Sequence, residues 1–161
     1  MEKKFKTVGV GGTFDEFHRG HRALILKAFE VGKSVLIGLS TDEFAGKLRK
    51  NRNIQPYEER LRELTVFLER NGLRCRAEIL PLEDPYGVAV TNGEIEAIIV
   101  SRETEPRAHS INEIRVEKGL RPLKVIAINM VPAEDDVTIS STRIRIGEID
   151  REGRLVSKRD I

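Results

Sequence analysis

Residues 8–25 read Val8-Gly-Val-Gly-Gly-Thr-Phe-Asp-Glu-Phe-His-Arg-Gly-His-Arg-Ala-Leu-Ile25, and this stretch decides the fold. An apolar run typical of a β-strand leads into a turn that contains Gly9, Gly11 and Gly12. A short polar loop with two histidines follows, and then a run of helix formers. The stretch therefore predicts a strand, a phosphate-binding loop and a helix, in that order.

The predicted loop has the features of a phosphate site. Glycines let a ligand approach the backbone and permit dihedral angles that a side chain forbids. A helix that opens near Gly20 points unpaired N–H groups and the positive end of its dipole at the loop, which favours an anion. His18 and His21 lie at that opening, where an imidazole N–H can donate to phosphate oxygens, and Asp15 is an ordinary loop acceptor. These features predict nucleotide binding, although isolated histidine pairs also occur on surface loops and in metal sites.

Two better-known phosphate motifs are excluded. Residues 9–14 resemble the dinucleotide fingerprint, but Phe14 stands where its third glycine belongs. Residues 32–34 (Gly-Lys-Ser) resemble the end of a Walker loop, but Lys27 stands where the first glycine belongs and an apolar, strand-like run follows. The remaining hypothesis is a site in which the histidines themselves hold phosphates.

Composition limits the class of protein. With 161 residues, 39% of them hydrophobic, we expect one domain over residues 1–161 with its own core. The formal net charge of +2 gives no general attraction to nucleic acid or to an anionic membrane, so neither partner is expected. The single Cys75 cannot form an internal disulfide, and no apolar N-terminal run has the length of a signal peptide or a membrane span. We therefore expect a cytoplasmic protein.

Hydrophobic patterning predicts a five-stranded parallel sheet. Segments typical of strands lie at residues 5–10, 34–39, 74–80, 95–100 and 123–128, of which 34–39 is a nearly continuous apolar run and 74–80 alternates. Helical patterns lie between them or after them, at residues 20–31, 56–71, 110–118 and 140–146. This alternation predicts an α/β fold, a single Rossmann-like domain with helices on both faces of the sheet. We expect the core over about residues 5–147, a solvated basic loop at 41–53, and a charged tail at 150–161 that frays.

The polar segments noticed separately follow the carboxyl ends of these strands. Ligands of open α/β sheets bind beyond those ends, where the strand order reverses. Residues 11–21 follow the first predicted strand, Lys47 the second, residues 82–86 the third, Arg102 the fourth and residues 140–142 the fifth. All of them are therefore expected on one rim.

Two motifs resemble the signatures of a known superfamily. Gly-Gly-Thr-Phe-Asp at 11–15 with His-Arg-Gly-His at 18–21 resembles the H-x-G-H signature of the nucleotidyltransferases, and Ile-Ser-Ser-Thr-Arg-Ile-Arg at 139–145 resembles their I-S-S-T-x-I-R signature. Three further segments resemble the archaeal and eukaryotic form of phosphopantetheine adenylyltransferase. They are Gln-Pro-Tyr-Glu-Glu-Arg (55–60), Pro-Leu-Glu-Asp-Pro-Tyr-Gly (81–87) and Val-Ser-Arg-Glu-Thr (100–104) with Ile111 and Asn112.

This resemblance implies an enzyme of coenzyme A biosynthesis. The implied reaction transfers AMP from ATP, with Mg²⁺, to 4′-phosphopantetheine and gives dephospho-CoA and pyrophosphate without a covalent enzyme intermediate. A phosphate acceptor is already an anion near neutral pH, because its second pKa is about 6. The protein must then supply alignment and charge stabilisation, which suits a site rich in donors and cations. No metal site formed by protein side chains is expected, because His109 and Cys75 are poorly placed as further ligands for the histidine pair.

The resemblance also implies roles for individual residues. For catalysis it points to His21 at the reacting phosphoryl oxygens, Lys47 between the acceptor phosphate and the α-phosphate, and Arg102 on the ATP phosphates. The residues expected against the nucleotide are Gly11, Gly12, Thr13, Phe14, His18, His21, Arg102, Ser140, Ser141 and Thr142. Those expected against the acceptor are Thr13, Lys47, Leu82 and Tyr86.

Some assignments stay open. Lys50 is close enough to Lys47 in the sequence to take its role, and Arg107 is equally well explained as a surface residue. Arg143 and Arg145 can both add positive charge, but one of them should face away. A Ser-Ser-Thr run before a helix is also typical of an ordinary N-cap.

Other functions also remain open. The two signatures alone do not exclude a nicotinamide-mononucleotide adenylyltransferase or a glycerol-phosphate cytidylyltransferase. A nucleotide-binding regulator without turnover is a further alternative, whereas a fragment of an aminoacyl-tRNA synthetase would lack a tRNA-binding module. We expect a monomer or a small homo-oligomer, and feedback by coenzyme A is undetermined.

Overall fold

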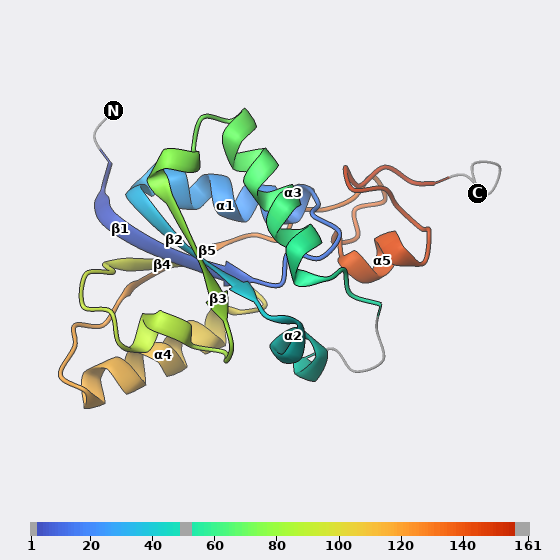
Figure 1. Cartoon of the computed structure of the whole chain (residues 1–161). Helices are drawn as coiled ribbons and strands as arrows, with labels where there is room; N and C mark the ends of the chain where they lie inside the picture. Colours follow the sequence, from blue (N-terminus) through green and yellow to red (C-terminus); the bar gives the residue numbers. More distant parts are fainter. Residues whose placement is uncertain (1–2, 49–52, 157–161) are drawn as a thin grey trace.

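The computed structural model describes residues 3–48 and 53–156, and its centre is a five-stranded parallel sheet (Figure 1). The strands run in the spatial order β3-β2-β1-β4-β5, so the order reverses between β1 and β4. Their bounds are β1 (Phe5–Gly12), β2 (Gly32–Ser40), β3 (Ala77–Leu82), β4 (Ala97–Ser101) and β5 (Lys124–Ile128). The predicted Rossmann-like α/β fold is confirmed.

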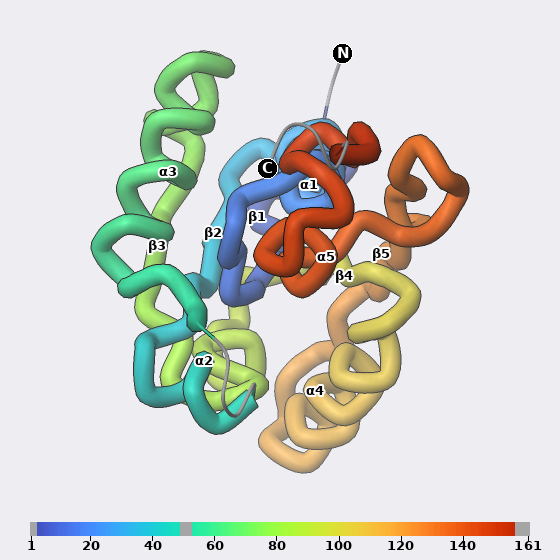
Figure 2. The backbone as a smooth tube through the Cα atoms, turned by 90° about the vertical axis from the view of Figure 1, so that its right-hand side faces the viewer, coloured from blue at the N-terminus to red at the C-terminus, as the bar shows by residue number. Residues whose placement is uncertain are grey.

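Helices cover both faces of the sheet and also lie beyond one of its edges. α1 (Arg19–Val31) and α3 (Tyr57–Arg70) cover one face, while α4 (Glu105–Glu117) and the 3₁₀ turn η2 (Gly87–Val90) cover the other. Figure 2 looks onto the carboxyl ends of the strands, where α2 (Asp42–Leu48) and α5 (Ser141–Arg145) lie. A second 3₁₀ turn, η1 (Arg74–Arg76), precedes β3. In the described ranges, no helix has the length and apolar character needed to cross a membrane.

Strand β4 shows why the predicted strands read as continuous apolar runs. Ala97 and Ile99 belong to the core under α1 and α3, whereas Ile98 and Val100 belong to the core under α4. All four are buried, because alternate residues of a central parallel strand face opposite covered surfaces.

The glycine turn predicted after the first strand is wrong. β1 continues through Gly12, and the left-handed backbone occurs instead at Phe14 and Glu16, each with φ of 53°. A Cβ at Gly12 would lie 3.2 Å from the Phe14 ring. The absence of a side chain there therefore serves close packing instead of an unusual dihedral angle.

The solvated loop predicted at residues 41–53 is also wrong in its first half. Asp42–Leu48 forms α2, whose first turn is capped by the Thr41 hydroxyl, which accepts a hydrogen bond from the N–H of Phe44 (3.2 Å). Phe44 and Ala45 are buried, so one side of this helix packs against the domain although the segment is rich in basic residues. The charged tail differs from prediction as well, because residues 149–155 form an ordered hairpin against the domain. The rest of the predicted loop, at 49–52, and of the predicted tail, at 157–161, lies outside the described residues.

Arg60 on α3 joins four segments at the carboxyl edge of the sheet. Its side chain is fully buried and donates to the carbonyl oxygens of Thr13 (2.9 Å), Ser40 (2.7 Å) and Gln55 (2.8 Å). It also forms an ion pair with Asp42 at 3.0 Å. A buried arginine is tolerated only when its N–H groups are paired, and here the pairing fixes the end of β1, the end of β2, the start of α2 and the start of α3.

We expect Arg60→Met to lower the free energy of unfolding by about 3 kcal/mol, because three carbonyl oxygens would lose their donor. Urea denaturation measures this loss. Arg62→Met is the matched control on the same helix, since the Arg62 side chain is 71% exposed, and it should change stability by less than about 0.5 kcal/mol. Similar losses for both variants would contradict a special role for Arg60.

Candidate functional site

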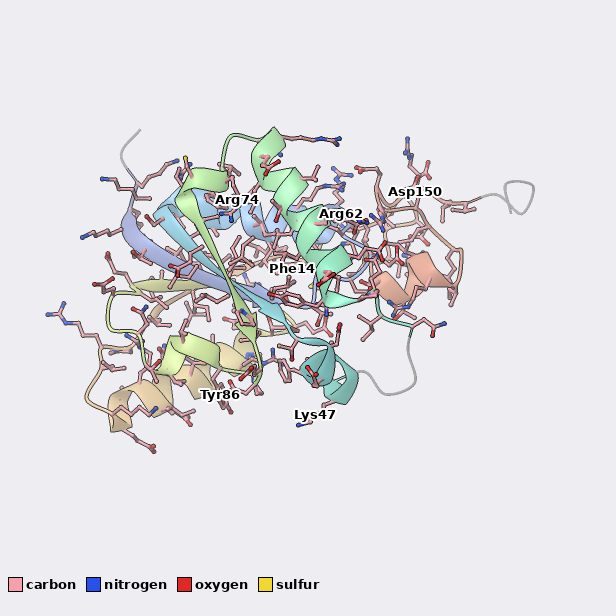
Figure 3. The ribbon with its side chains drawn as sticks, viewed as in Figure 1. Phe14, Lys47, Arg62, Arg74, Tyr86 and Asp150 are labelled. Atoms are coloured by element: carbon pink, nitrogen blue, oxygen red, sulfur yellow. The ribbon has the colours of Figure 1, made fainter. Side chains whose placement is uncertain are left out.

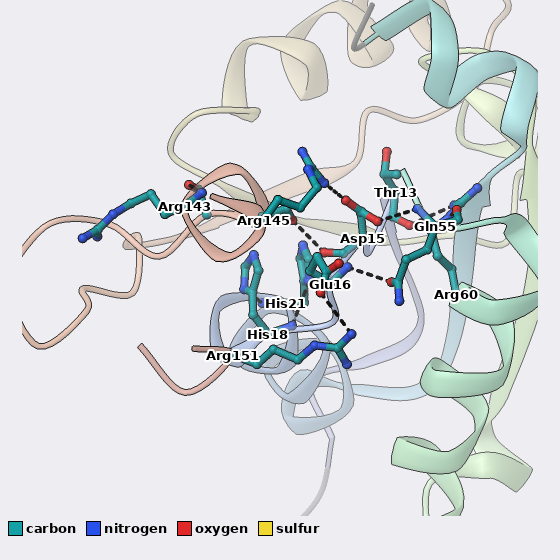
Figure 4. Close-up of polar contacts among 12 residues, drawn as sticks. Thr13, Asp15, Glu16, His18, His21, Gln55, Arg60, Arg143, Arg145 and Arg151 are labelled. Atoms are coloured by element: carbon teal, nitrogen blue, oxygen red, sulfur yellow. Dashed lines mark hydrogen bonds and ion pairs between the residues drawn. The ribbon is translucent and has the colours of Figure 1, made fainter. Parts of the chain in front are cut away.

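His18 and His21 together cap the start of α1. His18 is the N-cap, and its Nδ1 accepts hydrogen bonds from the N–H groups of Gly20 (3.0 Å) and His21 (3.3 Å). The N–H of His18 in turn donates to Nδ1 of His21 at 3.2 Å. The two rings stack with their centroids 3.6 Å apart (Figure 4). This is a capping box built from two imidazoles.

The cap determines where the ring protons lie. A nitrogen that accepts a backbone N–H cannot carry its own proton, so each neutral ring is protonated on Nε2. Both rings therefore present an Nε2–H donor on the side away from the cap. Two such donors are suited to oxygen atoms of an anion.

The backbone N–H groups at the start of α1 are not available to bind an anion. Arg19 donates to the carbonyl oxygen of Arg151 (2.9 Å), Arg22 donates to that of His18 (3.0 Å), and the two residues between them donate to the His18 ring. The prediction that unpaired N–H groups of this helix bind the anion is therefore wrong. The positive end of the helix dipole still favours an anion there, but the donors are side chains.

Gly20 is required by the same cap. A Cβ at this position would lie 2.9 Å from Cε1 and 3.1 Å from Nδ1 of His18. The glycine between the two histidines thus leaves space for the His18 ring over the first turn of the helix.

The loop that leads to the histidines holds a strained backbone. Phe14 and Glu16 both adopt φ of 53°, which costs a residue with a side chain about 1 kcal/mol or more. Phe14 is also buried, and the edge of its ring packs on His21 with centroids 5.4 Å apart. Such strain persists only where neighbouring groups hold the loop in place.

Asp15 fastens this loop to two distant segments. The side chain is 1% exposed, and its Oδ1 accepts a hydrogen bond from the N–H of Gln55 at 2.9 Å. Its other oxygen forms an ion pair with Arg145, and its backbone carbonyl accepts from the Ser141 hydroxyl at 2.6 Å. The sequence suggested only an ordinary acceptor here, but Asp15 links the two motifs directly.

The predicted Ser-Ser-Thr site is therefore in contact with the histidine loop. Ser140 caps α5 by accepting a hydrogen bond from the N–H of Arg143 (3.2 Å). The alternative that this run serves as an ordinary N-cap therefore holds for Ser140. Ser141 is buried against Asp15, while Thr142 is half-buried on the same turn. Through Asp15 the structure joins this turn to the histidine loop at the carboxyl edge of the sheet, and this junction is the candidate phosphate-binding crevice.

The two arginines of the second motif face in different directions, as Figure 4 shows. Arg143 points away from the crevice and pairs with Glu148 (2.8 Å) and Asp135, whose hydrogen bonds and charges raise the pKa of its guanidinium. Arg145 points to Asp15, and its Nη2 is buried without a partner among the residues described. Nη2 of Arg145 is therefore an unsatisfied buried donor beside Asp15.

The end of β1 forms the floor beside the crevice. Thr13 is half-buried there and lies 3.4 Å, hydroxyl to hydroxyl, from Ser40, which itself donates to the carbonyl of Gly12 at 3.3 Å. Gly11 is exposed next to them. Their contact with a nucleotide stays a prediction.

An apolar pocket begins on the same strands, on the face that α4 and η2 cover. It encloses about 100 Å³. Its floor contains Gly9, Gly11 and Gly38, at which any side chain would extend toward the cavity, and its wall contains Leu82 and Tyr86. Leu82 and Tyr86, two of the residues expected against the acceptor, therefore line one cavity.

The predicted cations lie apart from this pocket's lining, except for Arg107, which contributes to it. Lys47 is exposed on α2, and Figure 3 shows it pointing away from the sheet. Arg102 is exposed after β4, where it pairs with Glu105 (3.5 Å) and approaches Asn129 (3.5 Å). Lys50 falls outside the described residues.

The chain resembles known proteins over most of its length. The family model described as cytidylyltransferase-like matches residues 10–147. A phosphopantetheine adenylyltransferase of Methanothermobacter thermautotrophicus is 48% identical over 158 residues, covering 98% of this chain and 94% of the relative. That of Methanopyrus kandleri is 46% identical and covers 91% of this chain and 92% of the relative. A solved structure of a protein of unknown function from Archaeoglobus fulgidus has a TM-score of 0.69 at 30% identity, and covers 77% of this chain and 89% of the other.

We expect Gly20→Ala and Gly46→Ala to change stability in opposite directions. Gly46 lies in α2, and a Cβ at this position would have no other atom within 4 Å, so alanine should raise the free energy of unfolding by up to about 1 kcal/mol. At position 20 the new methyl group displaces the His18 ring. Loss of the cap should then lower the free energy of unfolding by about 1 kcal/mol. Chemical denaturation of both variants measures the difference, and stabilisation by Gly20→Ala would contradict the role of Gly20 in the cap.

Proposed function

Because the chain belongs to the cytidylyltransferase-like family, and within it to the phosphopantetheine adenylyltransferases, we propose that it transfers AMP from ATP to 4′-phosphopantetheine. The products are dephospho-coenzyme A and pyrophosphate. The acceptor phosphate attacks the α-phosphorus in line, the bond from that phosphorus to the bridging oxygen breaks, and pyrophosphate leaves with the electron pair. No covalent enzyme intermediate is formed.

One arrangement supports the proposal: the candidate phosphate-binding crevice and an apolar pocket both begin at the end of β1, where Gly11 lines the pocket and Thr13 leads into the histidine loop. Phosphate groups suit the crevice because His18, His21 and Arg145 supply N–H donors there. An acceptor with a phosphate at one end and a long arm that carries methyl and methylene groups suits the adjoining pocket. The glycerol and pyridinium parts of the alternative acceptors have no comparable arm, so the pocket favours pantetheine.

The chain supplies alignment and charge stabilisation in this mechanism. His21 donates its Nε2–H to the α-phosphoryl oxygens as negative charge develops, and His18 donates to the neighbouring phosphates. Ser140, Ser141 and Thr142 contact the β- and γ-phosphates beside Arg145, while Gly11, Gly12, Thr13 and Phe14 form the surface under the nucleotide. Lys47 approaches the acceptor phosphate from the solvent side. Arg102 approaches the ATP phosphates, also from the solvent side.

Magnesium enters with the nucleotide. The described residues contain no group of three or more His, Cys, Asp or Glu side chains placed to hold a metal, and Asp15 is already engaged by Arg145 and Gln55. Mg²⁺ commonly keeps several water ligands and binds through substrate phosphates, which fits a crevice of donors. When bound with ATP, the ion neutralises charge on the phosphates. We also propose a cytoplasmic monomer or small homo-oligomer.

The direct test is incubation of the purified protein with ATP, Mg²⁺ and 4′-phosphopantetheine. We expect dephospho-coenzyme A by mass detection and one pyrophosphate per product. Nicotinamide mononucleotide and glycerol phosphate, each with ATP and CTP, form the comparison panel. Binding of ATP without turnover of any acceptor would instead indicate a regulator.

We expect His21→Ala to lower the turnover rate by about 100-fold or more, and to weaken ATP binding much less, because its donor acts on charge that develops in the transition state. Steady-state kinetics and equilibrium titration with ATP measure the two effects separately. An equal loss in both would assign His21 to ground-state binding.

We expect Lys47→Ala to raise the KM for 4′-phosphopantetheine more than that for ATP. Lys50→Ala is the matched comparison, because it removes the same charge three positions away. If Lys50→Ala impairs acceptor use and Lys47→Ala does not, the acceptor contact belongs to Lys50.

A further inference from the structure

A hairpin outside the matched family region reaches the histidine loop. The family model ends at residue 147, and the chain then turns back on itself with Ile149 paired to Leu155. The Asp150 carboxylate stabilises the turn by accepting from the N–H groups of Glu152 and Arg154, both at 2.9 Å. This turn presents Arg151 toward the start of α1.

Arg151 contacts three elements at once, as Figure 4 shows in part. Its carbonyl oxygen accepts the N–H of Arg19, the first residue of α1, at 2.9 Å. One guanidinium nitrogen lies 3.1 Å from Oε2 of Glu16 in the histidine loop, and the other lies 2.9 Å from Oε1 of Glu63 on α3. A single residue therefore ties the loop and the helix start to the body of the domain.

The charges at this junction require the guanidinium. The Glu16 and Glu63 side chains are only 21% and 24% exposed, and Oε2 of Glu63 is buried without a hydrogen-bond partner in the described part of the chain. Burial acts to lower the pKa of Arg151, but hydrogen bonds and charges from Glu63 and Glu16 outweigh it and raise that pKa. Without Arg151, two poorly solvated carboxylates would repel each other across the junction.

The two α1-side partners of Arg151, Glu16 and Arg19, lie on either side of His18 in the sequence. Glu16, held in the left-handed region, lies two residues before His18, and Arg19 follows it directly. The hydrogen bonds of Arg151 thus hold both sides of the N-cap whose geometry fixes the ring protons of His18 and His21.

We propose that Arg151 is a positioning residue for adenylyl transfer, which acts by holding the histidine cap in the geometry that directs both Nε2–H groups into the crevice. The inference rests on the proposed function. Arg151 itself does not contact the substrates in this assignment. Its removal should therefore affect turnover more than substrate binding.

The test compares the intact protein with Arg151→Ala, Arg151→Lys and Arg154→Ala. Arg154 is the matched control, because it lies in the same hairpin, is 72% exposed and pairs with Asp150. We expect Arg151→Ala to lower kcat by about 10-fold or more with a smaller change in the KM for 4′-phosphopantetheine. Arg151→Lys should recover part of the rate, since it restores the charge but cannot bridge both carboxylates in a fork. Arg154→Ala should behave as the unmodified protein.

A second readout does not depend on activity. The chain has three histidines, of which His109 lies on α4, so long-range ¹H–¹⁵N spectra can report the ring tautomers individually. We expect Nε2–H tautomers for His18 and His21 in the intact protein, and mixed tautomers or exchange broadening in Arg151→Ala. If the intact protein shows these tautomers but makes no dephospho-coenzyme A, the proposed function fails while the positioning role of Arg151 is still decided by the spectra.

Glu16→Gln keeps the test valid if Arg151→Ala does not fold. This variant removes one charge from the junction and leaves the ion pair between Arg151 and Glu63 in place. We expect a smaller fall in kcat and the same direction of change in the histidine spectra. Unchanged tautomers together with a kcat within about twofold of the unmodified protein, in either folded variant, would overturn the proposal. An equal fall in Arg154→Ala would overturn it as well.

Discussion

The site depends on the reciprocal hydrogen bonds between His18 and His21. Each imidazole helps to cap a helix, and the use of Nδ1 by the backbone leaves the proton of the neutral ring on Nε2, which is the donor in the proposed mechanism. The same hydrogen bonds set the tautomers of the two rings, while Phe14 and Phe17 pack against the His21 ring. The remaining features, Gly20 beneath the His18 ring and the strained loop before it, are consequences of building a cap from residues this large.

The sheet divides the site into two chemically different parts. At the reversal of strand order, the loop after β1 leads to the histidines, while the glycines of β1 and β2 leave an apolar cavity under α4 and η2. A polar ligand group and an apolar one can therefore lie side by side within a few residues of Thr13. The loop can remain strained because Arg60, Asp15 and Arg151 attach it to separate parts of the domain.

The sequence was sufficient to predict the strands and the two motifs, because buried parallel strands are apolar throughout and the motifs are local. The sequence was insufficient to predict α2. In this short helix only Phe44 and Ala45 are buried, and two apolar residues among basic ones give little helical periodicity. Sequence reasoning also gave no role to Arg60, although the resemblance includes this residue in segment 55–60, and it did not single out Arg151. Whether an arginine is a surface charge or a structural cation depends on acceptors that the fold brings from far along the chain, and Arg62 and Arg154 have the same local character.

The contacts that complete the loop span very long stretches of chain, which has a kinetic consequence. Ser141 reaches Asp15 across 126 residues, and Arg151 reaches Glu16 across 135. Closing such loops costs entropy before any contact compensates for it, so contacts of this separation tend to form late. During refolding the histidine loop should therefore reach its final arrangement only after segments 126 and 135 residues away have met it.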